Sequence, residues 1–262
     1  MRWDPRQFSR STISSMSKLS TQTVLPVAIL AGGLATRMRP HTEKIPKALL
    51  DLNGEPFIAH QLRLLVGQGV TSVVLCTAHL GEMIAEYVGN GHQFGCHVRY
   101  SQDGEKLMGT AGALKRALPM LGEAFFVMYG DSYLPCDFSA IQQTFLQSGR
   151  RALMTVYKNQ GLFDASNVEY AGGEIRVYDK KLASPKLQHI DYGLELFQAR
   201  AFDAVPSDQP QDLASLLQSL LTQGQLASYE VLERFYEIGS LQGWQETAAY
   251  LQTRVTQERK PA

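Results

Sequence analysis

The sequence predicts an α/β fold: a Rossmann-like, mostly parallel sheet with helices on both faces, plus a smaller mixed or antiparallel lobe. Two observations support this prediction. In the first half of the chain, short apolar runs alternate with amphipathic segments of helical period, which is typical of βαβ units. Beyond residue 150 the segments become shorter and include a hairpin pattern, which indicates mixed or antiparallel pairing.

The first half begins with a buried strand. Residues 24–30 form an apolar run that is closed by Gly32 and Gly33, as expected where a parallel strand enters a loop. Residues 56–66 place apolar side chains on one helical face, and residues 70–77 are apolar and β-branched, as in a second buried strand. The remaining elements expected in this half are helices at 80–88 and 112–118 and strands at 98–101 and 125–129.

The second half is expected to contain more strands than helices. A hairpin is predicted where residues 167–170 and 174–178 flank Gly172 and Gly173, because paired glycines accept the positive φ angles of tight turns. The other expected elements are strands at 152–157, 191–197 and 235–238, and helices at 212–221 and 241–251.

We expect a single domain over residues 24–262, with a first half at 24–150 and a second half at 151–262. Residues 1–23 differ from the rest of the chain. They are rich in arginine, serine and threonine and lack the apolar core of a secretory signal. A flexible tail is therefore predicted, as is common at the ends of chains.

The composition of the chain gives no indication of a nucleic-acid or membrane partner. The chain has 262 residues with 25 basic and 25 acidic side chains, so nothing global indicates a nucleic acid or an anionic membrane. Its apolar runs are too short for a transmembrane helix. The three cysteines form no CxxC pair, which argues against a disulfide framework or a zinc site. A cytoplasmic protein is predicted.

The most informative segment reads LAGGLATRMRP over residues 30–40 and KIPKALL over residues 44–50. Glycines after a first strand let the backbone approach a ligand, and their N–H groups can form a cradle for anions. Arg37, Arg39 and Lys47 add positive charge nearby. Neither the dinucleotide fingerprint GxGxxG nor the P-loop GxxxxGK[ST] fits here. The segment predicts a site for a phosphate chain, and an ordinary turn beside a basic surface is the simpler alternative.

This order of residues resembles the signature of the sugar-1-phosphate nucleotidylyltransferases. The resemblance implies that Ala31, Gly32 and Gly33 wrap the triphosphate of the nucleotide. It also implies that Arg37 stabilises the leaving pyrophosphate and that Lys47 contacts phosphate near the reacting phosphorus, both as catalytic residues. One departure is Ala35, because the family usually has glycine before the Thr-Arg pair.

Three later segments extend the resemblance over roughly residues 24–250. The segment LMGTAGAL at 107–114 is similar to the second glycine motif of the family, which contacts the base of the nucleotide. Asp131 follows the apolar strand, where the family has a catalytic magnesium ligand. The nucleotide-binding candidates implied by the second motif are Gly109, Thr110 and Gly112, with Gln102 just before it.

The second half resembles the part of the family that binds the sugar phosphate. Glu237 stands where the family usually has a second aspartate for magnesium. Lys180 resembles the lysine that holds the acceptor phosphate and is preferred over Lys181 by register, although no proline follows it. Asp191 and Gly193 match the strand that lines the sugar pocket.

The resemblance implies a Mg²⁺-dependent enzyme that transfers a nucleoside monophosphate from an NTP to a sugar 1-phosphate and releases pyrophosphate. Guanylyl transfer to heptose or mannose 1-phosphate is the first expectation, with uridylyl transfer to N-acetylmuramate 1-phosphate as the alternative and cytidylyl transfer open. A non-catalytic nucleotide-sugar sensor is the rival of another class. A glycosyltransferase would require a DxD-type motif, which the residues after Asp131 do not supply. No nucleic-acid or membrane partner is expected, and the sequence leaves the oligomeric state open.

Overall fold

The computed structural model of the chain describes residues 23–33, 38, 40–104, 106–207 and 209–258, with side chains up to residue 254. The predicted tail therefore lies outside the described residues except for Thr23. The carbonyl of Thr23 accepts a hydrogen bond from the Gln142 side chain, which ties the start of the described chain to the domain.

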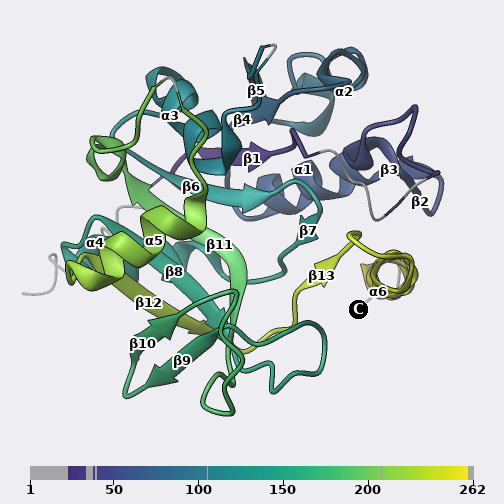
Figure 1. Cartoon of the computed structure of the whole chain (residues 1–262). Coiled ribbons are helices and arrows are strands. Elements are labelled where there is room, and N and C mark those ends of the chain that lie inside the picture. Colours follow the sequence, from purple (N-terminus) through teal and green to yellow (C-terminus); the bar gives the residue numbers. More distant parts are fainter. Residues whose placement is uncertain (1–22, 34–37, 39, 105, 208, 259–262) are drawn as a thin grey trace, which may run out of the picture.

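Within these residues a central sheet has the strand order β12-β8-β11-β6-β1-β4-β5 (Figure 1). Its parallel pairs are β1 with β4 and β6, β4 with β5, and β8 with β12, whereas β11 runs antiparallel to β6 and β8. The mostly parallel sheet is thus confirmed. The strand bounds are Val27–Leu30 (β1), Ser72–Thr77 (β4), His97–Gln102 (β5), Ala124–Tyr129 (β6), Ala152–Tyr157 (β8), Ile190–Gln198 (β11) and Leu226–Val231 (β12).

Helices cover both faces of the sheet (Figure 1). One face packs against α1, α2 and α4 through a single apolar cluster. The opposite face packs against α3 and α5 through a second cluster. This division follows from strands that are apolar on both faces, which a parallel sheet requires. The helix bounds are Phe57–Gly67 (α1), Gly81–Val88 (α2), Gly109–Leu121 (α3), Phe138–Ser148 (α4), Leu213–Thr222 (α5) and Leu241–Glu258 (α6).

Small antiparallel pairs accompany the central sheet. The hairpin of β9 (Val168–Ala171) and β10 (Glu174–Tyr178) turns at Gly172 and Gly173, whose φ angles are +63° and +79°, as predicted. The other two pairs are β2 (Asp51–Leu52) with β3 (Glu55–Pro56), and β7 (Ser132–Tyr133) with β13 (Tyr236–Glu237).

The second half contributes more to the central sheet than its predicted role as a smaller lobe suggested. Strands β8, β11 and β12 extend the sheet past β6, and the β9–β10 hairpin remains the separate antiparallel part. Strand β11 is buried along most of its length, because strands flank it on both sides. No helix among the described residues is long and apolar enough to cross a membrane.

Candidate active site

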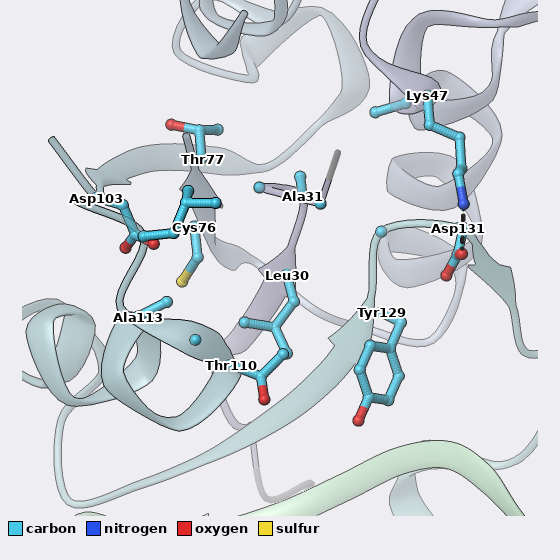
Figure 2. A pocket seen from close by; sticks show the side chains of 16 residues that line it. Leu30, Ala31, Lys47, Cys76, Thr77, Asp103, Thr110, Ala113, Tyr129 and Asp131 are labelled. Carbon is cyan, nitrogen blue, oxygen red and sulfur yellow. Dashed lines mark hydrogen bonds and ion pairs between the residues drawn. The ribbon is translucent and has the colours of Figure 1, made fainter. Parts of the chain in front are cut away.

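A cavity of about 300 Å³ opens at the carboxyl ends of β1, β4, β5 and β6 (Figure 2). From β1 the parallel order continues to β4 on one side and to β6 on the other, so this edge is a topological switch point, where open α/β sheets bind ligands. The predicted site residues that line the cavity are Ala31, Gly32, Gly33, Lys47, Gly109, Thr110 and Asp131.

The end of β6 lies unusually close to the end of β1. The N–H of Gly130 donates to the carbonyl of Leu30 at 2.9 Å. A Cβ at Gly130 would lie 2.8 Å from that same carbonyl oxygen, so only glycine permits the approach. The Gly-Asp pair after β6 therefore places Asp131 directly beside the glycine turn after β1.

In the turn after β1, Gly32 is closely packed, whereas Gly33 faces open space. The N–H of Ala31 donates to the Cys76 carbonyl at 2.8 Å, which ties the turn to β4. A Cβ on Gly32 would come within 3.1 Å of the Ala78 side chain, whereas Gly33 has open space around it. Arg37, predicted to stabilise the leaving group, and Ala35 lie outside the described residues.

Lys47 and Asp131 meet across the cavity mouth (Figure 2). Lys47 begins a short 3₁₀ helix at Lys47–Leu49, and its Nζ lies 2.9 Å from Asp131 Oδ2. The two side chains are 16% and 27% exposed. An ion pair this accessible contributes little to stability, about 0–1 kcal/mol, and a charged ligand can reach both groups.

The β7–β13 pair brings Glu237 close to Asp131 through the backbone. The N–H of Ile238 donates to the Asp131 carbonyl at 2.9 Å. The Glu237 side chain lines a second cavity of about 150 Å³ and lies against Gly239, where an added Cβ would come within 2.8 Å of its Oε2. The two predicted metal ligands thus stand on paired segments and line two different cavities.

The described residues contain no group of three or more His, Cys, Asp or Glu side chains arranged to hold a metal ion. Mg²⁺ does not require such a group, because it is commonly held by one or two carboxylates together with substrate phosphates and water. The carboxylate oxygens of Asp131 and Glu237 are of the type that Mg²⁺ accepts, although the two side chains line different cavities.

The second glycine motif forms the start of α3, where it packs against the segment before α5. The N–H of Ala111 donates to the Gln211 carbonyl at 2.9 Å, and the N–H of Gln211 donates to the Met108 carbonyl at 2.9 Å. The Thr110 hydroxyl is fully engaged: it donates to Asp212 at 2.9 Å and accepts from the Leu213 N–H at 2.7 Å.

Gly112 and Gln102 lie outside the lining of the cavity. A Cβ on Gly112 would be 2.8 Å from the Met108 side chain, so this glycine serves helix packing. The Gln102 side chain donates to Glu82 at 2.9 Å. The predicted contact of Gln102 with the base is thus not supported by the direction of its side chain.

Asp103 lines the cavity instead, and sequence reasoning missed it. It is 8% exposed, and its Oδ2 accepts from the Met108 N–H at 3.2 Å, which orders the loop that leads into α3. Burial first and the nearby Asp103 charge second raise the pKa of Cys76 to about 12, so this lining thiol stays protonated. The available signal was an acid followed by glycine at the end of a strand.

Replacement of Gly109 by alanine tests the packing at the start of α3. Gly109 has φ +71°, and an added Cβ would lie 2.6 Å from the Gln211 carbonyl oxygen. We expect a loss of at least about 2 kcal/mol in the free energy of unfolding, with weaker NTP binding. Thermal unfolding measures the loss of stability, and NTP titration measures the loss of binding. Gly224→Ala is the matched control, because Gly224 has φ +67° and open space around it. Equal effects of the two variants would contradict the clash.

The three residues predicted to bind the sugar phosphate come together beside this cavity. Lys180 Nζ lies 3.9 Å from Asp191 Oδ2 and 5.7 Å from the ring centre of Tyr129, which lines the cavity. Gly193 has φ +91°, and a Cβ there would face Tyr129 at 3.6 Å. The group therefore borders the cavity on the side of Tyr129.

Comparisons by sequence and by structure found similar known proteins. Among curated proteins, an N-acetylmuramate alpha-1-phosphate uridylyltransferase from Neisseria meningitidis is 41% identical over 117 residues, which are 44% of this chain and 51% of that protein. Mannose-1-phosphate guanyltransferase beta-A from Xenopus laevis is 28% identical over 217 residues, which are 80% of this chain and 60% of that protein. The chain thus spans about half to three-fifths of the length of these relatives.

A solved structure shares the fold. It is a candidate glucose-1-phosphate thymidylyltransferase from Bacillus anthracis, with a TM-score of 0.77 and 22% identity, over 86% of this chain and 94% of that one. The nucleotidyl transferase family matches residues 27–252, a range that contains every described residue of the cavity. The chain belongs to the nucleotidyl transferase family.

Proposed function

We propose that the chain transfers a nucleoside monophosphate from an NTP to a sugar 1-phosphate and releases pyrophosphate. The observation that carries this proposal is the Lys47–Asp131 pair at 2.9 Å, held beside a glycine turn at the switch point of the sheet. A cation, a carboxylate and accessible backbone together suit a phosphate chain better than an uncharged ligand.

The position of each residue in or beside the cavity suggests its role in the proposed reaction. The turn at Gly32 and Gly33 lets the backbone approach the triphosphate, and Lys47 offsets charge near the reacting phosphorus. The acceptor phosphate is already ionised at neutral pH, so alignment of acceptor and donor replaces a general base. Lys180 holds the acceptor phosphate. Mg²⁺ held by Asp131 and Glu237 would neutralise charge on the phosphate oxygens.

The identity of the base and of the sugar is a further part of the proposal. Guanylyl transfer to heptose or mannose 1-phosphate agrees with the LMGTAGAL segment and with the guanyltransferase relatives. Uridylyl transfer to N-acetylmuramate 1-phosphate is favoured by the 41% identity to the Neisseria relative. The two alternatives share every residue role given above.

Pyrophosphate release from the purified chain with Mg²⁺ tests this proposal. GTP, UTP, CTP, ATP and dTTP are each combined with a panel of sugar 1-phosphates that includes mannose, heptose and N-acetylmuramate 1-phosphate. Release with one pair is the expected result, and the pair identifies base and sugar together. NTP binding that is independent of Mg²⁺, without release for any pair, would instead indicate a nucleotide-sugar sensor.

A further inference from the structure

Glu195 is an acid in the interior of the central sheet. It lies in β11 opposite Val127 of β6 and Met154 of β8, and its exposure is 0%. Neither of its carboxyl oxygens receives a hydrogen bond from a donor among the described residues. Burial of an ionised carboxylate without a partner costs much free energy. The Glu195 carboxyl group must therefore either be protonated or have an opposite charge nearby.

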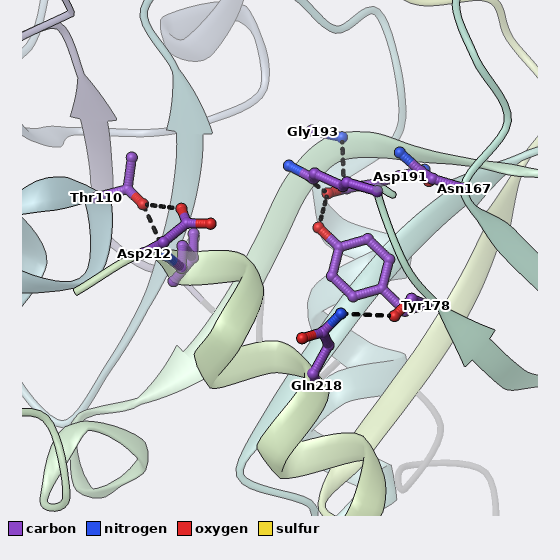
Figure 3. A network of polar contacts seen from close by, with 9 residues as sticks. Thr110, Asn167, Tyr178, Asp191, Gly193, Asp212 and Gln218 are labelled. Atoms are coloured by element: carbon purple, nitrogen blue, oxygen red, sulfur yellow. Dashed lines mark hydrogen bonds and ion pairs between the residues drawn. The ribbon is translucent and has the colours of Figure 1, made fainter. Parts of the chain in front are cut away.

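Asp191 lies four residues earlier in β11, opposite Val156, which is two residues from the Met154 that faces Glu195. The two acids therefore stand on the same face of the strand, and the Asp191 side chain is 4% exposed. Asp191 Oδ2 accepts from the Tyr178 hydroxyl at 2.9 Å, and Oδ1 accepts from the Gly193 N–H at 3.1 Å (Figure 3). A positive charge lies beside the pair: Lys180 Nζ is 3.9 Å from Asp191 Oδ2. Two carboxyl groups beside one ammonium are balanced when the pair carries one negative charge.

The surroundings keep this proton on the pair. Burial first and the charge of Asp191 second raise the pKa of Glu195 well above its ordinary value, and Lys180 opposes the shift. Tyr129 of β6 and Tyr178 of β10 face the same acids, and burial raises the pKa of both, so they remain neutral. Asp212, before α5, acts on Tyr129, and β8 presents the uncharged Met154.

We propose that Glu195 is a positioning residue that shares its proton with Asp191 and thereby leaves Lys180 free to turn to the phosphate of the acceptor. The proposal rests on the proposed function, in which Lys180 holds that phosphate. If both acids were ionised, two negative charges would hold Lys180 and would repel the approaching phosphate. With one shared proton, the phosphate competes against a single charge, and Asp191 remains fixed between Tyr178 and Gly193.

The shared proton is tested without any activity measurement. Folded Glu195 binds a proton that an unfolded glutamate releases above its ordinary pKa of 4.5, so stability falls as pH rises above that value. Between pH 5 and pH 7 the unfolding constant of the wild type should rise about tenfold per pH unit relative to Glu195→Gln, which cannot titrate. Glu169→Gln on β9 is the control and should keep the slope of the wild type. Equal slopes for wild type and Glu195→Gln would overturn the shared proton.

The positioning role is tested by steady-state kinetics at pH 7. Glu195→Met fills the same space without a hydrogen-bonding group, and we expect the KM for the sugar 1-phosphate to rise about tenfold, with kcat and the KM for NTP within about twofold. Glu195→Gln should restore the wild-type KM, because its amide can donate to Asp191. An unchanged acceptor KM in Glu195→Met would overturn the role. If no substrate pair reacts, the positioning role falls with the proposed function, whereas the pH slope still decides whether the proton is shared.

Discussion

Replacement of Asp131 by asparagine is expected to reduce nucleotidyl transfer by about 10³-fold or more, while the chain stays folded. The carboxylate lies at the cavity mouth, 2.9 Å from Lys47, and it is the acid of the glycine-acid pair that ends β6. Asparagine keeps the shape and removes the charge on which Mg²⁺ binding and phosphate neutralisation depend. Most of the effect should appear in kcat, because this charge acts where negative charge develops in the transition state.

The measurement is pyrophosphate release with the substrate pair found in the panel, together with thermal unfolding. The melting temperature should shift by only a few degrees, because the Lys47–Asp131 pair is partly exposed and contributes little. Asp203→Asn, the same substitution at an exposed position, is the control and should retain full turnover. Near-normal turnover of Asp131→Asn would remove this carboxylate from the mechanism.

Replacement of Lys47 by methionine is expected to cost about 10²–10³-fold in kcat/KM. The aliphatic part of the side chain is retained, and the ammonium that faces Asp131 is lost. NTP binding should weaken together with kcat, because Lys47 lines the cavity that we propose takes the triphosphate. Lys47→Arg should recover only part of the activity, since a planar guanidinium cannot occupy the place of a compact ammonium.

The same assay with varied NTP separates the two contributions of Lys47. Lys186→Met, at an exposed lysine, controls for the loss of one positive charge from the molecule. A variant of Lys47 whose kcat and KM for NTP both match the wild type would show that the ion pair with Asp131 is structural only.

Local patterns predicted the elements whose apolar residues are contiguous or strictly periodic. The runs at β1, β4 and β6 were such cases, because strands buried on both faces have no polar interruption. Helix α4 was missed although its signals exist: Phe138, Ile141 and Phe145 lie on one face, and Asp137 caps it by accepting from the Ala140 N–H. Polar glutamines between these apolar residues made the helical period of the apolar positions hard to recognise.

Pairing between distant strands could not be predicted from local patterns. Strand β12 has the sequence LASYEV, which shows no clear alternation, and it is a strand because β8 offers a parallel partner. In the same way, the place of β11 between β6 and β8 depends on the sequences of all three strands together. The second half therefore looked like a separate lobe when it was considered segment by segment.

The candidate site shows the same limit at the level of single residues. Lys47 and Asp131 were selected by motif, and the parallel topology brings their segments together at one sheet edge. Gln102 was selected by its place before the second glycine motif, whereas its neighbour Asp103, just past the end of β5, lines the cavity. Glu195 offered a signal that was not used: like Asp191, it is an acid within an otherwise largely apolar strand.

The two-residue ladder between β7 and β13 also constrains when the site can form during synthesis. Asp131 leaves the ribosome with the first half of the sheet, whereas Glu237 and Ile238 follow only after α5 and β12. A nascent chain that stops before β13 has the glycine turn and Asp131 but lacks the strand whose N–H holds the Asp131 carbonyl. Since domains generally fold as units, we expect this edge of the sheet to be complete only after β13 has been synthesised.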